Sequence, residues 1–339
     1  MNGKYLSKTV ANRRFVRGNS VILPSGKPVN GVLIFDIDST VADTKPWFAD
    51  IILPLIEKLA AKFGCPAPRI HQLFAKLAME TSLHEYGYVV ERIADECPDL
   101  ALSAELVSEA AAEFWKGFSV AHYSIQPYPA LVETLKRLRK NCPGMAIVAL
   151  TDAPDFLAPA RLAHIGALPY FDGIVAIESR RPDLKNQAYV VCELESRHRM
   201  ETMQLGYCEN LVMQASLPFE HAKPSDVGIG FIIEWLGLDA DQVVICGDKE
   251  TKEGLAATNW HIANPEAPGH ITYLRAFYGV RDVMEKKFVE LGKKIPTMAP
   301  KAPADDHGIH IDADLHTFAD IIPHIEGKFG RRKESKFAA

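Results

Sequence analysis

Two aspartates, Asp36 and Asp38, directly follow a short apolar run, Val32–Phe35, near the start of the chain. An apolar run this short, bounded by polar residues, is typical of a strand that is buried on both faces of a parallel sheet. Alternation along the backbone would place both carboxylates on the same side. A strand-end turn with solvated acids is the structural alternative. Because close carboxylates repel each other, however, the pair indicates a site for a divalent cation such as Mg²⁺.

Two later apolar runs, 145–150 and 243–246, also end in polar residues that could do chemistry. In open α/β sheets, ligands bind at the carboxyl ends of the strands, so three such ends in one sheet indicate a shared site. The polar residues are Thr151 and Asp152 after the first run, Gly247 and Asp248 after the second, Glu250 and Glu253 in the turn that follows, and Lys223 at the start of a helix between the runs.

These residue types suit the hydrolysis of a phosphate ester. A carboxylate nucleophile can form an acyl-phosphate and so divide the reaction into two easier steps. A second carboxylic acid can protonate the leaving oxygen and then activate water. A hydroxyl and a lysine can hold the phosphate oxygens, while further carboxylates hold Mg²⁺.

The four segments, in their order along the chain, resemble the motifs of the haloacid dehalogenase (HAD) superfamily of phosphohydrolases. The first motif, D-x-D-x-[TV], is matched by Asp36-Ile-Asp-Ser-Thr40, and the second, a Thr or Ser at the next core strand, by Thr151. Lys223-Pro224 matches the third motif, and Gly247-Asp248 with Glu253 is a looser match to the fourth.

The resemblance implies a role for each matching residue. Asp36 would be the nucleophile and Asp38 the general acid and base, while Thr151 and Lys223 would bind the phosphoryl group. The implied Mg²⁺ ligands are Asp36, the backbone carbonyl of Asp38, Asp248 and, near the metal or its waters, Glu253.

The sequence departs from the family pattern at two places in these motifs. Ser39 stands where the family often has Gly, and Glu253 replaces the usual Asp, with Glu250 as a competitor for its role. These departures concern the metal geometry and the substrate more than the fold.

The order of apolar patterns predicts an α/β fold, with a Rossmann-like parallel sheet core, helices on both faces and an inserted all-helical cap. The resemblance places this cap where the family has a C1 cap. The expected parts are an N-terminal arm (1–30), the core (31–44 and 122–325), the cap (45–121) and a disordered tail (326–339). Within the core, we expect insertions at about 179–220 and 265–308.

The charge, the apolar runs and the cysteines of the chain indicate which partners and which cellular location are compatible with this chemistry. The chain of 339 residues has a net charge of −5, so it lacks the overall positive charge that is typical of nucleic-acid-binding proteins. No apolar run approaches the roughly 20 residues that span a bilayer, and the N-terminus lacks the apolar region of a secretory signal. Six cysteines without C-x-x-C spacing predict reduced thiols in a cytoplasmic protein. The sequence carries no signal for an oligomeric state.

Two further groups of residues are open to more than one interpretation. His307, His310, Asp312, Asp314 and His316 are ligand-type residues, but alternating polar positions on an exposed edge strand would explain them as well. Asp152 could serve as a turn former or as a ligand.

The leading functional hypothesis is Mg²⁺-dependent hydrolysis of a small phosphorylated metabolite through an aspartyl-phosphate. A phosphomutase or phosphotransferase of the same fold would use the same motifs. A non-catalytic phosphate sensor is the alternative of a different class, although a binding module needs no nucleophile such as Asp36. A dehalogenase of this fold would not need the acid that Asp38 supplies.

Overall fold

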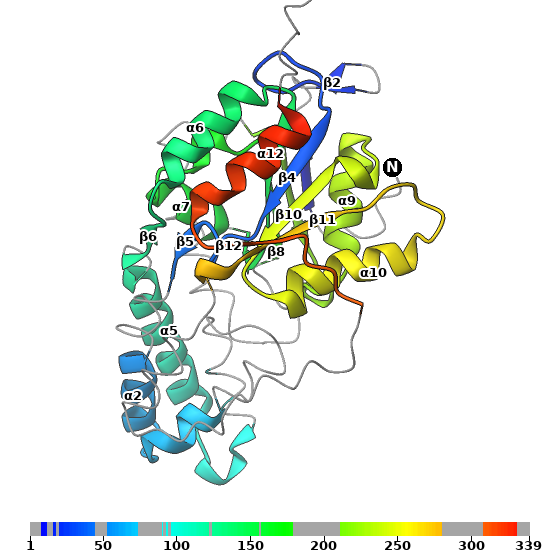
Figure 1. Ribbon diagram of the computed structural model, residues 1–339. Coiled ribbons are helices and arrows are strands. Elements are labelled where there is room, and N and C mark those ends of the chain that lie inside the picture. The colour runs from blue at the N-terminus through cyan, green and yellow to red at the C-terminus, as the bar shows by residue number, and fades with distance from the viewer. Residues whose placement is uncertain are drawn as a thin grey trace, which may run out of the picture.

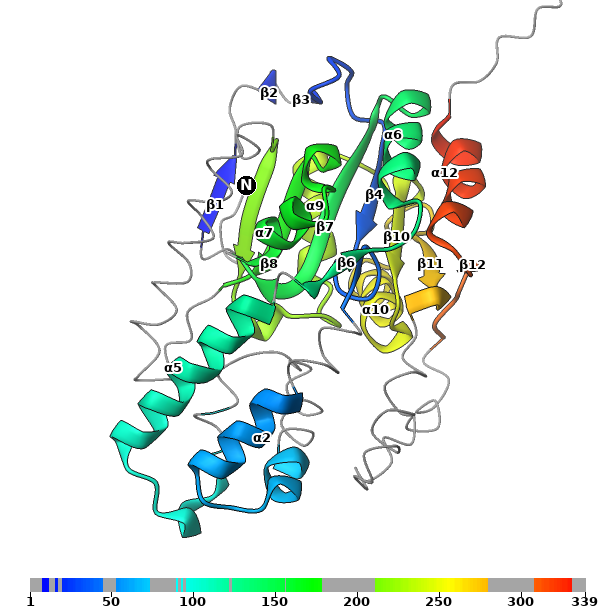
Figure 2. The same ribbon diagram turned by 90° about the vertical axis from the view of Figure 1, so that its left-hand side faces the viewer.

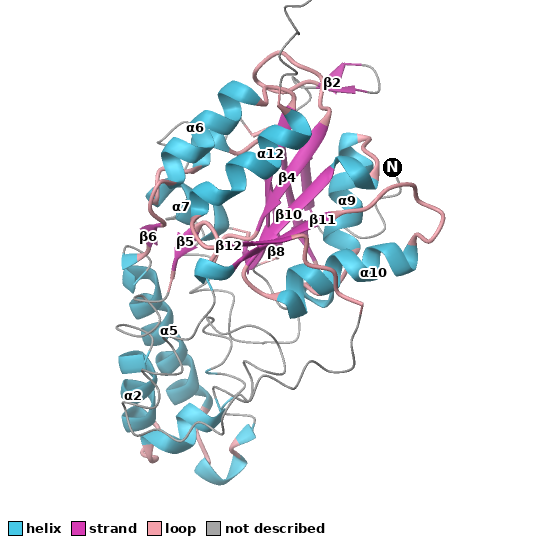
Figure 3. Ribbon diagram, in the orientation of Figure 1, coloured by secondary structure: helices cyan, strands magenta, loops and turns pink. Residues whose placement is uncertain are grey.

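The computed structural model describes residues 8–11, 16–17, 20–44, 53–73, 90, 93, 96–121, 124–155, 157–178, 211–279 and 308–330. An eight-stranded sheet organises these residues, in the order β1-β9-β8-β7-β4-β10-β11-β12. Seven neighbouring strands, from β9 to β12, run parallel, and β1 pairs with β9 antiparallel at one edge. Helices lie on both sides of the sheet (Figure 3).

The strands of the main sheet are β1 (Lys8–Ala11), β4 (Gly31–Phe35), β7 (Met145–Pro154), β8 (Gly173–Ile177), β9 (Met213–Leu217), β10 (Val243–Gly247), β11 (Thr272–Ala276) and β12 (Ala313–Leu315). Two ribbons pair β2 (Val16–Arg17) with β3 (Ser20–Val21) and β5 (Ala42–Asp43) with β6 (Gln126–Pro127). The α-helices are α2 (Leu53–Lys62), α5 (Ala104–Ala121), α6 (Leu131–Asn141), α7 (Leu157–His164), α9 (Val227–Leu236), α10 (Leu255–Ala263) and α12 (Ile321–Phe329). The short helical turns include η9 (Glu250–Gly254) and η10 (Phe277–Gly279).

The central strand β4 divides the core into two apolar layers. Val32 and Ile34 pack into the layer that α9 and α10 cover, whereas Leu33 and Phe35 face the layer of α6, α7 and α12 (Figure 1). All four side chains are almost completely buried, and burying one of this size stabilises the fold by about 1.5–3 kcal/mol. Because helices cover both faces of β4, each of its side chains is buried, and this explains why its apolar run is unbroken.

A helical block lies between β5 and β6 in the chain, and its described helices include α2 and α5. Two views at right angles place these helices beyond the carboxyl end of β4 (Figures 1 and 2). Ile56 of α2 and Phe114 of α5 are buried in the same apolar cluster as Leu33 and Phe35. No helix of the described residues is both long and apolar enough to cross a membrane.

The predicted fold class is confirmed, and the structure adds strands that the sequence pattern missed. β9 and β11 lie within the stretches expected to be insertions, and β1 lies within the expected N-terminal arm. Polar residues interrupt both β9 and β11, which hides the apolar run of a buried strand. α12 extends to Phe329, into the stretch expected as a tail. Residues 45–52, 179–210, 280–307 and 331–339 lie outside the described residues.

Asp172, just before β8, connects three strands. Its amide donates a hydrogen bond to the carbonyl of Ile147 (2.7 Å), and its carbonyl accepts one from Val212 (2.6 Å). Its carboxylate accepts hydrogen bonds from the amide of Ile147 (2.8 Å) and the guanidinium of Arg139 (2.7 Å). Burial raises the pKa of this carboxyl group, although Arg139 opposes the shift.

We expect Asp172→Ala to lower the free energy of unfolding by about 2–4 kcal/mol, because it removes the carboxylate that accepts from the buried amide of Ile147 and from the guanidinium of Arg139. Urea denaturation at neutral pH measures this loss. Asp241→Ala, at an exposed position, is the control and should change stability by less than about 0.5 kcal/mol. Equal effects of the two substitutions would contradict the structural role of Asp172.

Candidate active site

Asp36 lies where β4 ends, and the neighbouring strand holds it there. Its amide donates a hydrogen bond to the carbonyl of Cys246 in β10 (3.0 Å), so the strand pairing continues as far as this residue. Its carboxylate is buried, and one oxygen lies 2.8 Å from the ammonium nitrogen of Lys223. The first predicted site residue is thus a buried carboxyl group in direct contact with a lysine ammonium.

Three buried carboxylates meet at this point. Asp36, Asp248 and Glu253 each offer an oxygen, and these oxygens lie within 4.8 Å of one another. Burial raises the pKa of Glu253 to about 7, with Lys223 opposing the shift and Asp36 and Asp248 adding to it. The ammonium of Lys223 contacts two of these acids, and the three carboxylates, when all are ionised, outnumber this one positive charge by two.

Close packing at Gly247 explains why Glu253 reaches the cluster. A Cβ atom on Gly247 would lie 2.2 Å from Cγ of Glu253, so the side chain occupies space that only a glycine leaves open. The turn η9 directs Glu253 inward, where it also accepts a hydrogen bond from the amide of Lys249 (3.1 Å). The competitor Glu250 points elsewhere and forms an ion pair with Arg275.

Lys223 is the buried cation of the site. Its ammonium contacts Asp36 and, at 2.5 Å, Glu253. Burial alone would lower its pKa, but Asp36, Glu253 and Asp152 outweigh burial and raise it well above its ordinary value. The side chain is therefore charged at neutral pH and suited to holding the oxygens of an anionic group.

Asp152 holds the backbone of Lys223 by a hydrogen bond. Its carboxylate accepts a hydrogen bond from the amide of Lys223 (2.9 Å) and pairs with the ammonium of Lys252 (2.6 Å). Burial raises the pKa of Asp152, but Lys252 and Lys223 together lower it below its ordinary value. The residue thus ties the turn after β10 to the segment that carries Lys223.

Thr151 lies at an irregularity of β7. Pairing with β8 is regular up to Leu150 and resumes only at Pro154. The register of β7 with β4 pairs Ala149 with Phe35, which puts Thr151 beside the residues that follow Asp36. Its hydroxyl is buried and accepts a hydrogen bond from the amide of Ala153 (3.1 Å).

Asp38 is placed differently from Asp36. Its carboxylate lies outside the three-acid cluster and forms an ion pair with Arg161 of α7, a side chain with no exposed surface. Sequence reasoning missed Arg161. The available signal was a single arginine within the apolar stretch Leu157–Leu162, where its burial demands an anionic partner.

The segment after β11 closes over the loop of the first motif. Ser39 has a left-handed backbone, with φ of 61°, which accounts for the family's frequent glycine at this position. A Cβ atom on Gly279 would lie 1.9 Å from the carbonyl oxygen of Ser39 and 2.9 Å from Cβ of Asp248. The neighbouring Tyr278 donates a hydrogen bond to the carbonyl of Thr40 (2.8 Å). No sequence motif indicated these contacts.

The residues of the cluster fit a hard divalent cation. Carboxylate oxygens are the ligands that Mg²⁺ prefers, and a charge of +2 would balance the excess of the three acids. Asp36 and Asp248 are the direct candidates. Glu253, whose two oxygens already accept from Lys223 and the amide of Lys249, fits a position beside the ion.

Comparison with known proteins agrees with the parallel α/β fold described above. Residues 31–193 match the model of a family described as haloacid dehalogenase-like hydrolase. The chain is similar to the crystal structure of a HAD phosphatase from Thermococcus onnurineus, with a TM-score of 0.50, 16% identity, and coverage of 88% of this chain and 98% of that one. It is also similar to a 2-haloacid dehalogenase from Pseudomonas syringae pv. tomato DC3000, with a TM-score of 0.49, 15% identity, and coverage of 88% and 99%.

A curated relative, phosphoglycolate phosphatase 1 of Pseudomonas aeruginosa, is 24% identical over 156 residues. The match spans 45% of this chain and 53% of that relative, about half its length. Fold and site define a parallel α/β protein with a buried acidic cluster at the carboxyl edge of its sheet. The family model covers residues 31–193, slightly less than half of the chain, and this match agrees with the resemblance that the four motifs carry.

We expect Gly279→Ala to reduce any activity of this site by about 100-fold, because the added methyl group displaces the loop of Ser39 or the segment of Asp248. Steady-state kinetics measures the loss. Gly327→Ala is a matched control, since a Cβ atom there meets no atom within 4 Å. If Gly279→Ala keeps full activity, the close contact does not position the site.

Mg²⁺ should stabilise the protein more at about pH 8 than at about pH 6. Because the pKa of Glu253 is raised from 4.5 to about 7, ionising it without a cation destabilises the folded state as the pH rises through this range. A cation bound beside Glu253 relieves that cost. Thermal unfolding with saturating Mg²⁺ or EDTA at both pH values measures the difference, and Glu253→Gln should abolish it. A shift in Tm that is the same at both pH values would contradict this assignment.

Proposed function

We infer that this protein is a Mg²⁺-dependent phosphatase that hydrolyses a small phosphate monoester through an aspartyl-phosphate. One observation carries the proposal: the buried carboxylate of Asp36 lies in contact with Lys223 and within a cluster of two further acids. A binding module would have no use for a carboxylate nucleophile held beside an ammonium group that can bind phosphate. The curated relative named as a phosphatase supports the same chemistry.

In the first half of the reaction, a carboxylate oxygen of Asp36 attacks phosphorus and forms the aspartyl-phosphate. The bond from phosphorus to the leaving oxygen breaks, and Asp38 gives its proton to that oxygen as it departs. Lys223 and the hydroxyl of Thr151 hold the phosphoryl oxygens as their charge changes. Bound Mg²⁺ would supply charge neutralisation between the phosphate and the carboxylates.

In the second half, water attacks phosphorus and the bond to Asp36 breaks, which releases inorganic phosphate and restores the carboxylate. Asp38 accepts the proton of the attacking water. Its pairing with Arg161 favours the ionised form that this step needs. Donation in the first half requires a protonated Asp38, so we expect the ion pair to loosen when the dianionic substrate binds.

The substrate class in this proposal is a small phosphorylated metabolite, and a phosphomutase or phosphotransferase is the alternative that uses the same residues. The two differ in the acceptor of the phosphoryl group, which is water for a phosphatase and a second hydroxyl for a transferase. The cytoplasmic location stays a prediction from the sequence.

Hydrolysis of an aryl phosphate, and of a panel of natural phosphate monoesters, tests the proposal. The wild-type protein should release phosphate with Mg²⁺ and should lose this activity in EDTA. Asp36→Asn should reduce kcat by about 1,000-fold or more, because the amide is a poor nucleophile.

Asp241→Asn, at an exposed position, is the matched control and should retain full activity. Unchanged turnover in Asp36→Asn would overturn the assigned nucleophile. The absence of turnover over the whole panel, with phosphate still bound, would favour the sensor. Transfer of phosphate to an added alcohol or sugar in preference to water would favour the transferase.

A further inference from the structure

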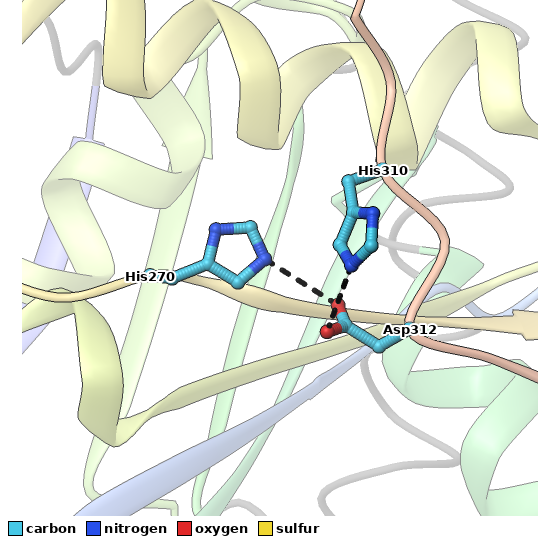
Figure 4. A group of neighbouring side chains, drawn as sticks. All are labelled: His270, His310 and Asp312. Carbon is cyan, nitrogen blue, oxygen red and sulfur yellow. Dashed lines mark ion pairs between the residues drawn. The ribbon is translucent and has the colours of Figure 1, made fainter.

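A second group of ligand-type side chains lies on the surface away from the acidic cluster. His270, His310 and Asp312 each offer a ligand atom, and these atoms lie within 4.8 Å of one another. Both imidazole rings point toward the carboxylate of Asp312 (Figure 4). The Nε2 atoms of His270 and His310 each lie 3.5 Å from an oxygen of Asp312. All three residues are exposed, so an ion from solvent could reach them.

The structure selects only part of the histidine-rich stretch noted in the sequence and adds a distant residue to it. His310 and Asp312 belong to that stretch, but Asp314 binds Arg275 (2.6 and 2.8 Å) and the ring of His316 lies against Phe277. His307 lies outside the described residues. The added ligand, His270, precedes β11 and carried no signal in the sequence.

The group is separate from the proposed active site. Asp36 and Asp248 follow the carboxyl ends of β4 and β10. His270 precedes β11, and Asp312 lies opposite Tyr273 near the start of that strand. The parallel register therefore places the two groups toward opposite ends of the strands.

The distances favour a shared ion over hydrogen bonds. A hydrogen bond from nitrogen to oxygen measures about 2.7–3.2 Å, which is shorter than either 3.5 Å contact. Ligands at about 2.0–2.2 Å from a tetrahedral Zn²⁺ lie roughly 3.4 Å apart, close to the observed value. An ion-pair explanation would also require two positively charged rings to share one carboxylate.

Neighbouring groups hold these ligands in place. The carboxylate of Asp312 accepts a hydrogen bond from the amide of Tyr273 (2.8 Å), and its own amide donates to the carbonyl of Tyr273 (2.9 Å). The ring of His270 stacks on that of His261, with centroids 5.5 Å apart and planes inclined by 8°. His261 in turn accepts a hydrogen bond from the amide of Ile271 (3.2 Å). Such outer contacts are what orient metal ligands.

We propose that His270, His310 and Asp312 form a second metal site, which binds a divalent transition-metal ion such as Zn²⁺. Two neutral imidazoles and a carboxylate are a frequent ligand set for zinc, with the remaining position open to water. The set differs from the all-oxygen cluster of the proposed active site, so the two sites should select different ions. The bound ion would join the start of β11 to the segment that leads into β12.

Zinc binding in the presence of excess Mg²⁺ tests this site without relying on activity. The full chain, stripped of metals with a chelator and then dialysed, is titrated with Zn²⁺ against a chromophoric chelator. We expect one Zn²⁺ per chain with micromolar or tighter affinity. His270→Ala, His310→Ala and Asp312→Ala should each weaken zinc binding by at least about 100-fold, because loss of a direct ligand costs more than the roughly 10–100-fold that loss of a supporting contact costs.

Two variants serve as controls. His324→Ala removes another exposed histidine, and Asp36→Asn removes an acid of the proposed active site; both should leave the zinc affinity unchanged. Co²⁺ in place of Zn²⁺ should show visible absorption bands without the near-ultraviolet band of thiolate ligands. Binding weaker than millimolar would overturn the proposal, as would zinc that is lost in Asp36→Asn but retained in His270→Ala.

Discussion

The contact of one buried ammonium group with two buried carboxylates is the interaction on which the site depends. Lys223 contacts Asp36 and Glu253 and so offsets part of the repulsion among Asp36, Asp248 and Glu253. Without Lys223, bringing these acids together would strongly destabilise the fold. Burial raises the pKa of Glu253, and the negative charges of Asp36 and Asp248 add to the shift that Lys223 opposes. A cation bound at this cluster would therefore stabilise the folded state.

The sequence indicated which residues lie at this edge of the sheet because the pattern that reveals them is local. A strand covered on both faces must be apolar throughout, so the ends of β4, β7 and β10 were visible as abrupt changes from apolar to polar residues. Parallel strands then bring their carboxyl ends together, whatever the connections between them. This much defines where Asp36, Thr151 and Asp248 lie.

Several contacts of the site depend on packing between distant segments and could not be predicted from the sequence. The choice of Glu253 over Glu250 depends on the space beside Gly247, and the partner of Asp38 is Arg161, from a helix far along the chain. β11 was hidden because Arg275 interrupts its apolar pattern to reach Glu250 and Asp314. Nothing in the sequence around Gly279 indicates that the backbone carbonyl of Ser39 lies against it. Contacts of this kind follow from the assembled fold and from no single segment.

The ribbon of β5 and β6 has a consequence for how such a protein can diversify. Asp43 and Gln126 are paired directly across it, so the chain leaves the sheet-bearing part and returns to it at adjacent positions. The helical block between them can then be exchanged for a different one at a single junction, with the ends already side by side. Ala42 in the same ribbon pairs with Asp38, so a grafted block would inherit the acid in its place. Such an exchange would leave the acids at the edge of the sheet in their places.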